Sequence, residues 1–352
     1  MIPGTIPAMG IASTVSGFSG KWRIIACPRI CMVLAGLLLA ISVSSPAAAD
    51  PAQWLREFPK TDFSKHSINY REIRSDGTER DSIPPIRAPK FVAVDAIQSI
   101  GPLEPVISLK LNDEARAYPL RILLWHEIVN DVVGGMPVLI SYCPLCNSAV
   151  VFERRLDGET LSFGNTGRLR HFDMVMYDKK TESWWQQFTG EAIVGGLTGR
   201  SLKPLAAMIE SFELFKASHP DGQVLVPNNP KARPYGTTPY VRMDSRDDTA
   251  SRFPYDMPDG ILPLERVVVV GNDAWPLKRL ADKRRIVTDE LILSWSEGQN
   301  SIHDTRWIPF GRDIGNVTVE RYDGVERTDA VYDTTFAFAF AAFRPDGVWH
   351  LK

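Results

Sequence analysis

Residues 137–152 read PVLISYCPLCNSAVVF, and this stretch decides the local fold from which the rest of the chain can be interpreted. The apolar run 137–142 is typical of a buried β-strand, and residues 149–152 are apolar enough to form a second strand. Between them lie two cysteines, a proline and Asn147, which is a residue type that tolerates a left-handed turn. We therefore predict a hairpin that carries Cys143 and Cys146 at its tip.

The first interpretation of this pair is a metal site. Two thiolates supply half of a tetrahedral set of ligands, so the remaining ligands must come from other residues or from outside the protein. His126 is the first candidate and His171 the second, with Glu127 and Asp173 as acidic alternatives. Thiolates combined with imidazole suit copper or zinc, and iron less specifically.

Two other interpretations stay open. In a thiol–disulfide oxidoreductase, Cys143 would be the nucleophile, and His126 or Glu127 would accept the proton. A thioredoxin-type fold is not indicated, because a strand rather than a helix is predicted after Cys146. In the third interpretation the cysteines are structural, and a disulfide closing so small a loop would contribute modestly to stability.

Three further side chains are candidates for binding a ligand or cofactor. Trp184 and Trp185 could line a cleft, although adjacent aromatic residues more often pack in a core. Arg170 could hold an anionic ligand, although it lies in a polar stretch that is typical of a solvated loop. A non-enzymatic binding module with structural cysteines is therefore a further hypothesis.

The N-terminus predicts export. Lys21, Arg23 and Arg29 are the only charged residues before Asp50, and they precede an apolar run that is too short to span a membrane. The small residues 47–49 offer a cleavage site, so we expect residues 1–49 to be a Sec-type signal peptide, with the true start at Met1 or later. The mature protein would be periplasmic or secreted, with no transmembrane domain.

The charge of the mature chain limits its partners. Removal of residues 1–49 leaves 37 basic and 42 acidic residues, a net charge of −5, and no run of Lys and Arg suggests nucleic acid. It also removes Cys27 and Cys31, so the cysteine pair has no other cysteine to bond with. The partners expected for such a pair are a periplasmic redox protein or a metal-transfer protein.

Short β-branched runs separated by Pro and Gly predict a β-rich α+β fold of mostly antiparallel strands with a few short helices. We expect an extended lead-in over residues 50–90 and one domain over 91–352. Residues 263–273 resemble 102–113, which indicates either an internal repeat with halves near 100–220 and 261–345 or a chance similarity of two strand-turn-strand units. Apolar residues at helical spacing predict an amphipathic helix over 203–218.

Several motifs together resemble the DUF3179 family of uncharacterised proteins. They are residues 125–131 (WHEIVND), 142–148 (YCPLCNS), 163–170 (FGNTGRLR), 176–178 (MYD) and 181–187 (TESWWQQ), followed by the alternating Phe and Ala of 336–345. The resemblance extends from about residue 85 to 345. It implies that the His126-Glu127 and Cys143–Cys146 blocks belong to one unit, and it implies no substrate or cofactor.

Overall fold

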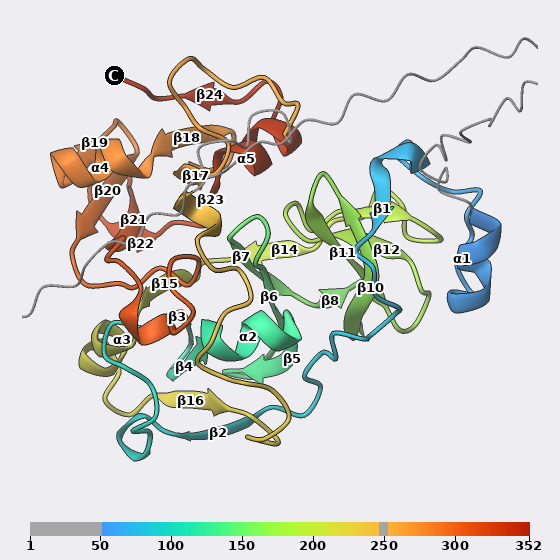
Figure 1. Ribbon diagram of the computed structural model, residues 1–352, viewed down its shortest axis with the longest axis horizontal. Helices are drawn as coiled ribbons and strands as arrows, with labels where there is room; N and C mark the ends of the chain where they lie inside the picture. Colours follow the sequence, from blue (N-terminus) through green and yellow to red (C-terminus); the bar gives the residue numbers. More distant parts are fainter. Residues whose placement is uncertain (1–50, 246–252) are drawn as a thin grey trace, which may run out of the picture. The chain divides into compact units, whose positions relative to one another are not determined.

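The computed structural model describes residues 51–245 and 253–352 (Figure 1). The predicted signal peptide and its cleavage site lie outside these residues. Strands predominate, and the paired strands are antiparallel except for β4 with β16 and β18 with β24. The predicted β-rich α+β class is therefore confirmed. In the described part of the chain, every helix is too short or too polar to cross a membrane.

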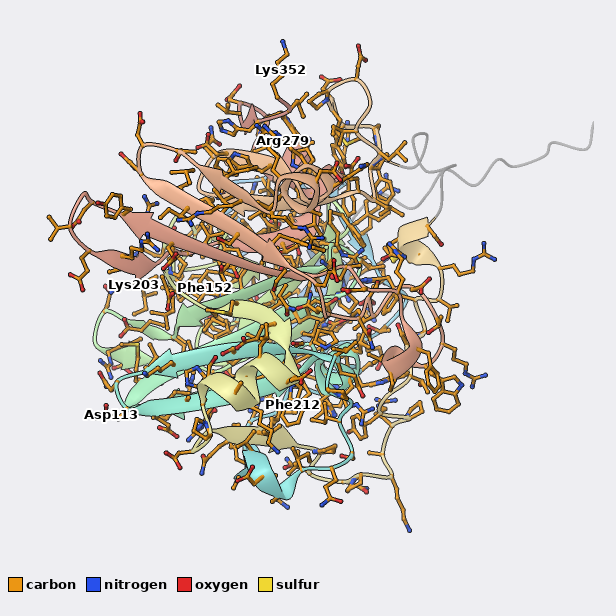
Figure 2. All side chains as sticks on the ribbon, turned by 90° about the vertical axis from the view of Figure 1, so that its left-hand side faces the viewer. Asp113, Phe152, Lys203, Phe212, Arg279 and Lys352 are labelled. Atoms are coloured by element: carbon orange, nitrogen blue, oxygen red, sulfur yellow. The ribbon has the colours of Figure 1, made fainter. Side chains whose placement is uncertain are left out.

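Two sheets form the first half of the fold. One has the strand order β15-β3-β4-β16-β2, and the other has the order β14-β7-β6-β5. Their strands are β2 (Lys90–Ala93), β3 (Pro105–Leu111), β4 (Glu114–Pro119), β5 (Ile128–Val133), β6 (Met136–Cys143), β7 (Ser148–Glu153), β14 (Lys203–Leu205), β15 (Met208–Ser211) and β16 (Gln223–Val226). Helix α2 (Leu120–His126) follows β4 directly, and α3 (Phe212–Ser218) follows β15. Figure 2 shows Phe152 and Lys203 side by side where β14 joins β7.

The second half also contains two sheets, with the strand orders β23-β17-β18-β24 and β19-β20-β21-β22. The first corresponds to β15-β3-β4-β16 of the first half, and the second corresponds to β5-β6-β7-β14. Their strands are β17 (Arg266–Val270), β18 (Asp273–Pro276), β19 (Arg285–Val287), β20 (Leu291–Ser296), β21 (Asn316–Tyr322), β22 (Arg327–Asp329), β23 (Asp333–Phe336) and β24 (Val348–Trp349). Helices α4 (Leu277–Lys283) and α5 (Ala337–Phe343) occupy the places of α2 and α3 in the order of elements. Both α2 and α4 end at a residue of positive φ, Glu127 (56°) and Arg284 (61°). The same order of elements thus occurs in both stretches in which the sequence suggests a repeat.

One segment distinguishes the two halves. Between β7 and β14 the chain forms a small hairpin, β8 (Arg155–Leu156) with β9 (Glu159–Thr160), and then four strands of a further sheet. These are β10 (Phe163–Arg170), β11 (Asp173–Asp178), β12 (Trp184–Gln186) and β13 (Ala192–Val194). At the corresponding point of the second half, residues 323–326 connect β21 to β22 directly. The inserted sheet therefore has no counterpart in the second half.

Residues 51–90, which we expected to be an extended lead-in, also form helix and strand. Helix α1 (Pro51–Glu57) carries the buried Trp54, and β1 (Ile73–Ser75) pairs with β10. Short 3-10 turns occur at Tyr70–Glu72, Val94–Ala96, Met243–Ser245 and Ile308–Phe310. Residues 51–90 are thus partly helical and partly paired, rather than a simple extended lead-in.

The helix predicted over 203–218 is wrong for its first half. Residues 203–205 and 208–211 are β14 and β15, and only 212–218 are helical. β15 pairs with β3, and the Ser211 hydroxyl accepts a hydrogen bond from the Leu214 N–H, which caps the helix. The pairing and the cap together fix the start of α3 at Phe212, although the apolar spacing suits a longer helix.

Candidate functional site

The cysteines lie at the tip of the predicted hairpin. Cys143 is the last residue of β6, and residues 144–147 form the loop that leads into β7. Asn147 adopts the left-handed conformation that the sequence allowed, with φ 54°. Both cysteines are free thiols, and they are 2% and 0% exposed. The chain thus holds two reduced sulfurs together in a site closed to solvent.

A second hairpin tip, from the inserted sheet, faces this one. The β10–β11 turn consists of His171 and Phe172, whose φ values are 52° and 63°. Two-residue turns with positive φ at both positions normally favour Asn and Gly, so this turn is costly for His and Phe. Asp173, the next residue, is fully buried, and its carboxylate joins both thiols in a group whose ligand atoms all lie within 4.8 Å of one another.

The main chain of the same turn also contacts the thiols. The carbonyl oxygen of Phe172 lies 3.2 Å from the Cys146 Sγ and 3.8 Å from the Cys143 Sγ. The Phe172 ring packs against Phe253 and Phe338, with ring centroids 4.9 and 6.0 Å away. The aromatic packing holds the turn in place while its carbonyl faces the sulfurs.

Burial controls the protonation of all three groups. Loss of solvation raises the pKa of the Cys143 thiol and raises the pKa of the Cys146 thiol well above its usual range. Burial also raises the pKa of Asp173 to about 6. In the absence of a cation, the two thiols are therefore neutral at physiological pH.

One oxygen of Asp173 is available for further chemistry. Oδ2 accepts hydrogen bonds from the Gln186 side chain and from the Phe188 N–H, the latter over 3.0 Å. Oδ1 is buried, and among the described residues the Cys143 and Cys146 thiols are the groups beside this carboxylate that can donate to it. A buried carboxylate oxygen without a partner is unfavourable, and a cation or a thiol proton would satisfy it.

Glu127 lies outside this group but within its electrostatic range. Its carboxylate accepts a hydrogen bond from the Asn165 amide over 2.5 Å. Burial, and next the charge of Asp76, raise the pKa of Glu127 to about 8. This residue is therefore neutral at pH 7 and accepts protons only at higher pH.

The two histidines expected as ligands are held elsewhere. The His126 ring lies 2.7 Å from the Pro84 carbonyl oxygen through Nδ1 and 2.8 Å from the Tyr235 hydroxyl through Nε2. His171 Nδ1 lies 3.2 Å from the Tyr255 hydroxyl, and its Nε2 lies 3.3 Å from the Glu72 carboxylate. Both nitrogens of each ring are occupied, so the structure brings neither histidine to the cysteines and brings Asp173 instead.

The residues expected to contact a ligand are parts of the core or of an ion pair. Trp184 and Trp185 are fully buried. Trp184 packs against Phe58 and Phe63, with ring centroids 5.2 and 5.4 Å away, and the Trp185 indole N–H donates to Asp178 over 3.1 Å. Arg170 is paired with Glu72 over 2.7 Å. The tryptophans therefore pack in the core and do not line a cleft. The charge of Arg170 is compensated by Glu72, so this side chain is not free to bind an anionic ligand.

The second half of the chain contacts the cysteine loop, and no motif in the sequence predicts this contact. The Cys146 carbonyl accepts hydrogen bonds from the Phe336 N–H (2.8 Å) and the Thr335 hydroxyl (2.7 Å). The side-chain amide of Asn147 donates to the Thr334 carbonyl over 2.7 Å. Strand β23 therefore fixes the backbone conformation around Cys146.

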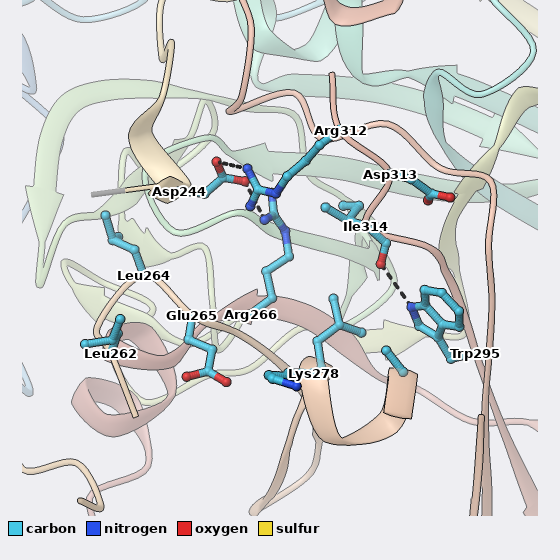
Figure 3. A pocket seen from close by; sticks show the side chains of 12 residues that line it. Asp244, Leu262, Leu264, Glu265, Arg266, Lys278, Trp295, Arg312, Asp313 and Ile314 are labelled. Atoms are coloured by element: carbon cyan, nitrogen blue, oxygen red, sulfur yellow. Dashed lines mark hydrogen bonds and ion pairs between the residues drawn. The ribbon is translucent and has the colours of Figure 1, made fainter. Parts of the chain in front are cut away.

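A buried histidine makes the second connection. His303 donates from Nε2 to the Pro144 carbonyl oxygen over 2.8 Å, while its Nδ1 accepts from Arg266 over 3.3 Å. Figure 3 shows Arg266 and Arg312 converging on Asp244. The contacts are 2.6 Å for Arg266 and 2.8 Å for Arg312, and the three residues line a cavity of about 530 Å³. A network of charged residues in the second half thus reaches the loop between the two cysteines.

These features define a β-rich α+β protein with a buried Cys-Cys-Asp group between two hairpin tips. The chain belongs to the family described as protein of unknown function (DUF3179), whose model matches residues 80–347. The match includes both cysteines, Asp173 and all strands of the matching sheets except β24, and it confirms the resemblance found from the motifs. No curated protein and no solved structure matches the chain.

Proposed function

We propose that this protein binds a soft metal ion, copper or zinc rather than iron, through Cys143, Cys146 and Asp173. The observation that carries the proposal is the convergence of two thiols and a carboxylate within 4.8 Å in a fully buried site. The role would be metal handling or electron transfer. If the predicted signal peptide is cleaved near Ala49, the site would work in the periplasm or outside the cell, with a metal-transfer or redox partner.

The electrostatics of the site support a cation. The raised pKa values show that the free thiolates are unfavourable there, and a bound metal ion removes this penalty because it holds thiols in their deprotonated form. The Asp173 carboxylate, which the Cys146 and Cys143 thiols contact, supplies a buried oxygen to the same group. Two thiolates and a carboxylate carry three negative charges, which a divalent ion largely compensates.

The test is elemental analysis, with a thiol count, of protein purified without a metal-affinity tag. We expect close to one copper or zinc ion per chain, which is lost in Cys143→Ser and in Cys146→Ser. His126→Ala is the matched control and should retain the ion, because His126 lies outside the group. Equal metal content in the wild type and both ligand variants would refute the proposal.

A second candidate is thiol–disulfide exchange. Its supporting observation is that the two cysteines, which are not joined by a disulfide, lie beside Asp173, whose pKa of about 6 suits a proton acceptor. The 2% exposure of Cys143 weighs against it, because attack on a disulfide requires access to the sulfur. A measurable reduction potential in metal-free protein, lost in Cys143→Ser, would favour this function.

The third hypothesis, a ligand-binding module centred on the tryptophans, receives less support. Trp184 and Trp185 have no exposed surface with which to contact a ligand.

A further inference from the structure

The β10–β11 turn supplies two oxygen atoms to the cysteine site, and this feature goes beyond the three-ligand group. Asp173 gives its carboxylate and the preceding Phe172 gives its main-chain carbonyl, both from the same tip. We propose that the Phe172 carbonyl is the fourth ligand and that the site is a closed tetrahedral centre of two sulfurs and two oxygens that selects Zn²⁺. This inference rests on the proposed metal-binding function.

The distances can be compared with a tetrahedral centre. An ion with bonds of about 2.3 Å to sulfur and about 2.1 Å to oxygen places a sulfur and an oxygen about 3.6 Å apart. The Phe172 carbonyl oxygen lies 3.2 Å from one sulfur and 3.8 Å from the other. These two contacts, in which the neutral thiols donate to the carbonyl, bracket the expected separation, so the carbonyl lies within reach of an ion bound to both sulfurs.

The backbone of the turn supports the same role. His171 and Phe172 both adopt positive φ, which is an unfavourable conformation for residues with a β-carbon, and such backbone outliers concentrate at functional sites. The conformation directs the Phe172 carbonyl toward the sulfurs. Asn and Gly would form the turn with less strain. The packing of the Phe172 ring against Phe253 and Phe338 is a second reason for a phenylalanine at this position.

The two sulfurs and two oxygens of the proposed site favour zinc over copper, the two metals that the cysteine pair alone does not distinguish. Carboxylate and carbonyl oxygens are hard ligands, and Cu⁺ prefers thiolate or thioether sulfur, whereas Zn²⁺ accepts sulfur and oxygen together in tetrahedral geometry. Four protein ligands leave no position for a water molecule, which is typical of a structural or storage zinc site. Zn²⁺ has no redox chemistry, so metal handling would be the role and electron transfer would not.

The alternative fourth ligand is water. The outer side of the same turn lines a cavity of about 390 Å³, together with Arg74, Ser75, Pro254 and Tyr255. If the carbonyl turned away from the ion, a water molecule would have to complete the coordination. A closed site and an open site therefore differ by one exchangeable ligand.

The experiment uses the full mature protein, loaded with Zn²⁺ for X-ray absorption and with Co²⁺ for optical spectroscopy. We expect two sulfurs at about 2.3 Å and two oxygens at about 2.0–2.1 Å around zinc. Added azide should leave the Co²⁺ spectrum unchanged. In Asp173→Ala, which vacates one position, azide should change it.

The outcomes separate the two proposals. An azide-sensitive wild-type spectrum, or a shell with more than two oxygens, would show a solvent ligand and overturn the closed site, while metal binding by the cysteines would stand. Copper bound in preference to zinc would also overturn it. Wild-type protein that retains neither zinc nor cobalt would overturn the metal function and the fourth ligand together.

Discussion

The imidazole Nε2 of His303 lies 2.8 Å from the carbonyl oxygen of Pro144, the residue after the first cysteine of the site. The two residues are 159 positions apart, so the second half of the chain directly determines the shape of the loop that carries the thiols. Arg266 donates to the other ring nitrogen, which fixes His303 as the neutral tautomer with the proton on Nε2.

The first prediction concerns acid stability. Burial, and next the charge of Arg266, lower the pKa of His303 to about 3, whereas the unfolded value is 6.5. The unfolded chain therefore binds this proton first, and His303 destabilises the fold as pH falls from about 6.5 to 3, by at most about 5 kcal/mol. His303→Gln can keep the hydrogen bond to Pro144 but does not titrate. Denaturant unfolding across this range should show a weaker loss of stability in the variant, and parallel pH profiles would refute the prediction.

A second prediction tests the left-handed residue after the cysteine pair. Asn147→Ala and Asn147→Gly both lose the side-chain hydrogen bond to Thr334, so the two variants differ mainly in backbone strain at φ 54°. Alanine should be the less stable by about 1 kcal/mol, because its β-carbon disfavours this conformation. Chemical denaturation measures the difference. Equal stabilities would mean that the loop relaxes to another conformation.

The third prediction concerns thiol reactivity. Cys143 and Cys146 are buried and their pKa values are raised, so metal-free native protein should react with iodoacetamide at pH 8 at least about 100-fold more slowly than unfolded protein. Mass spectrometry of samples quenched over time gives both rates. Rapid labelling of one cysteine in the native state would indicate an accessible nucleophile and favour thiol–disulfide exchange.

Metal removal supplies the fourth prediction. An ion held by Cys143, Cys146 and Asp173 would join the β6–β7 hairpin to the β10–β11 hairpin, so it should stabilise the folded state. Free zinc at 100 times its dissociation constant would add about 2.7 kcal/mol. Thermal unfolding with zinc and with a chelator should differ in the wild type and should coincide in the Cys143→Ser, Cys146→Ser double variant. A zinc effect that persists in the double variant would locate the ion elsewhere.

The last prediction separates packing from binding at Trp184. This side chain is fully buried against Phe58 and Phe63, so Trp184→Ala should cost about 3–5 kcal/mol of stability. The metal content per folded molecule should not change, because the residue is not in the Cys-Cys-Asp group. A stable variant with altered metal content would contradict both statements.

The sequence alone determined the features that depend on neighbours along the chain. Strand propensity around Cys143 and Cys146, with Pro144 and Asn147 between the strands, was enough to predict a hairpin with both thiols at its tip and the conformation open to Asn147. The helix predicted from the spacing of apolar residues was wrong at residues 203–211. The pairing of β15 with β3 is a long-range contact that competes there with helix formation.

Only the tertiary structure decided which residues complete the site. His126 is closer in sequence to the cysteines than Asp173, but its ring is held by Pro84 and Tyr235. Asp173 reaches the thiols because the inserted sheet brings the β10–β11 turn against the β6–β7 loop. Local propensities set the shape of each hairpin, whereas the meeting of two hairpin tips depends on burial and hydrogen bonds between segments far apart in the chain.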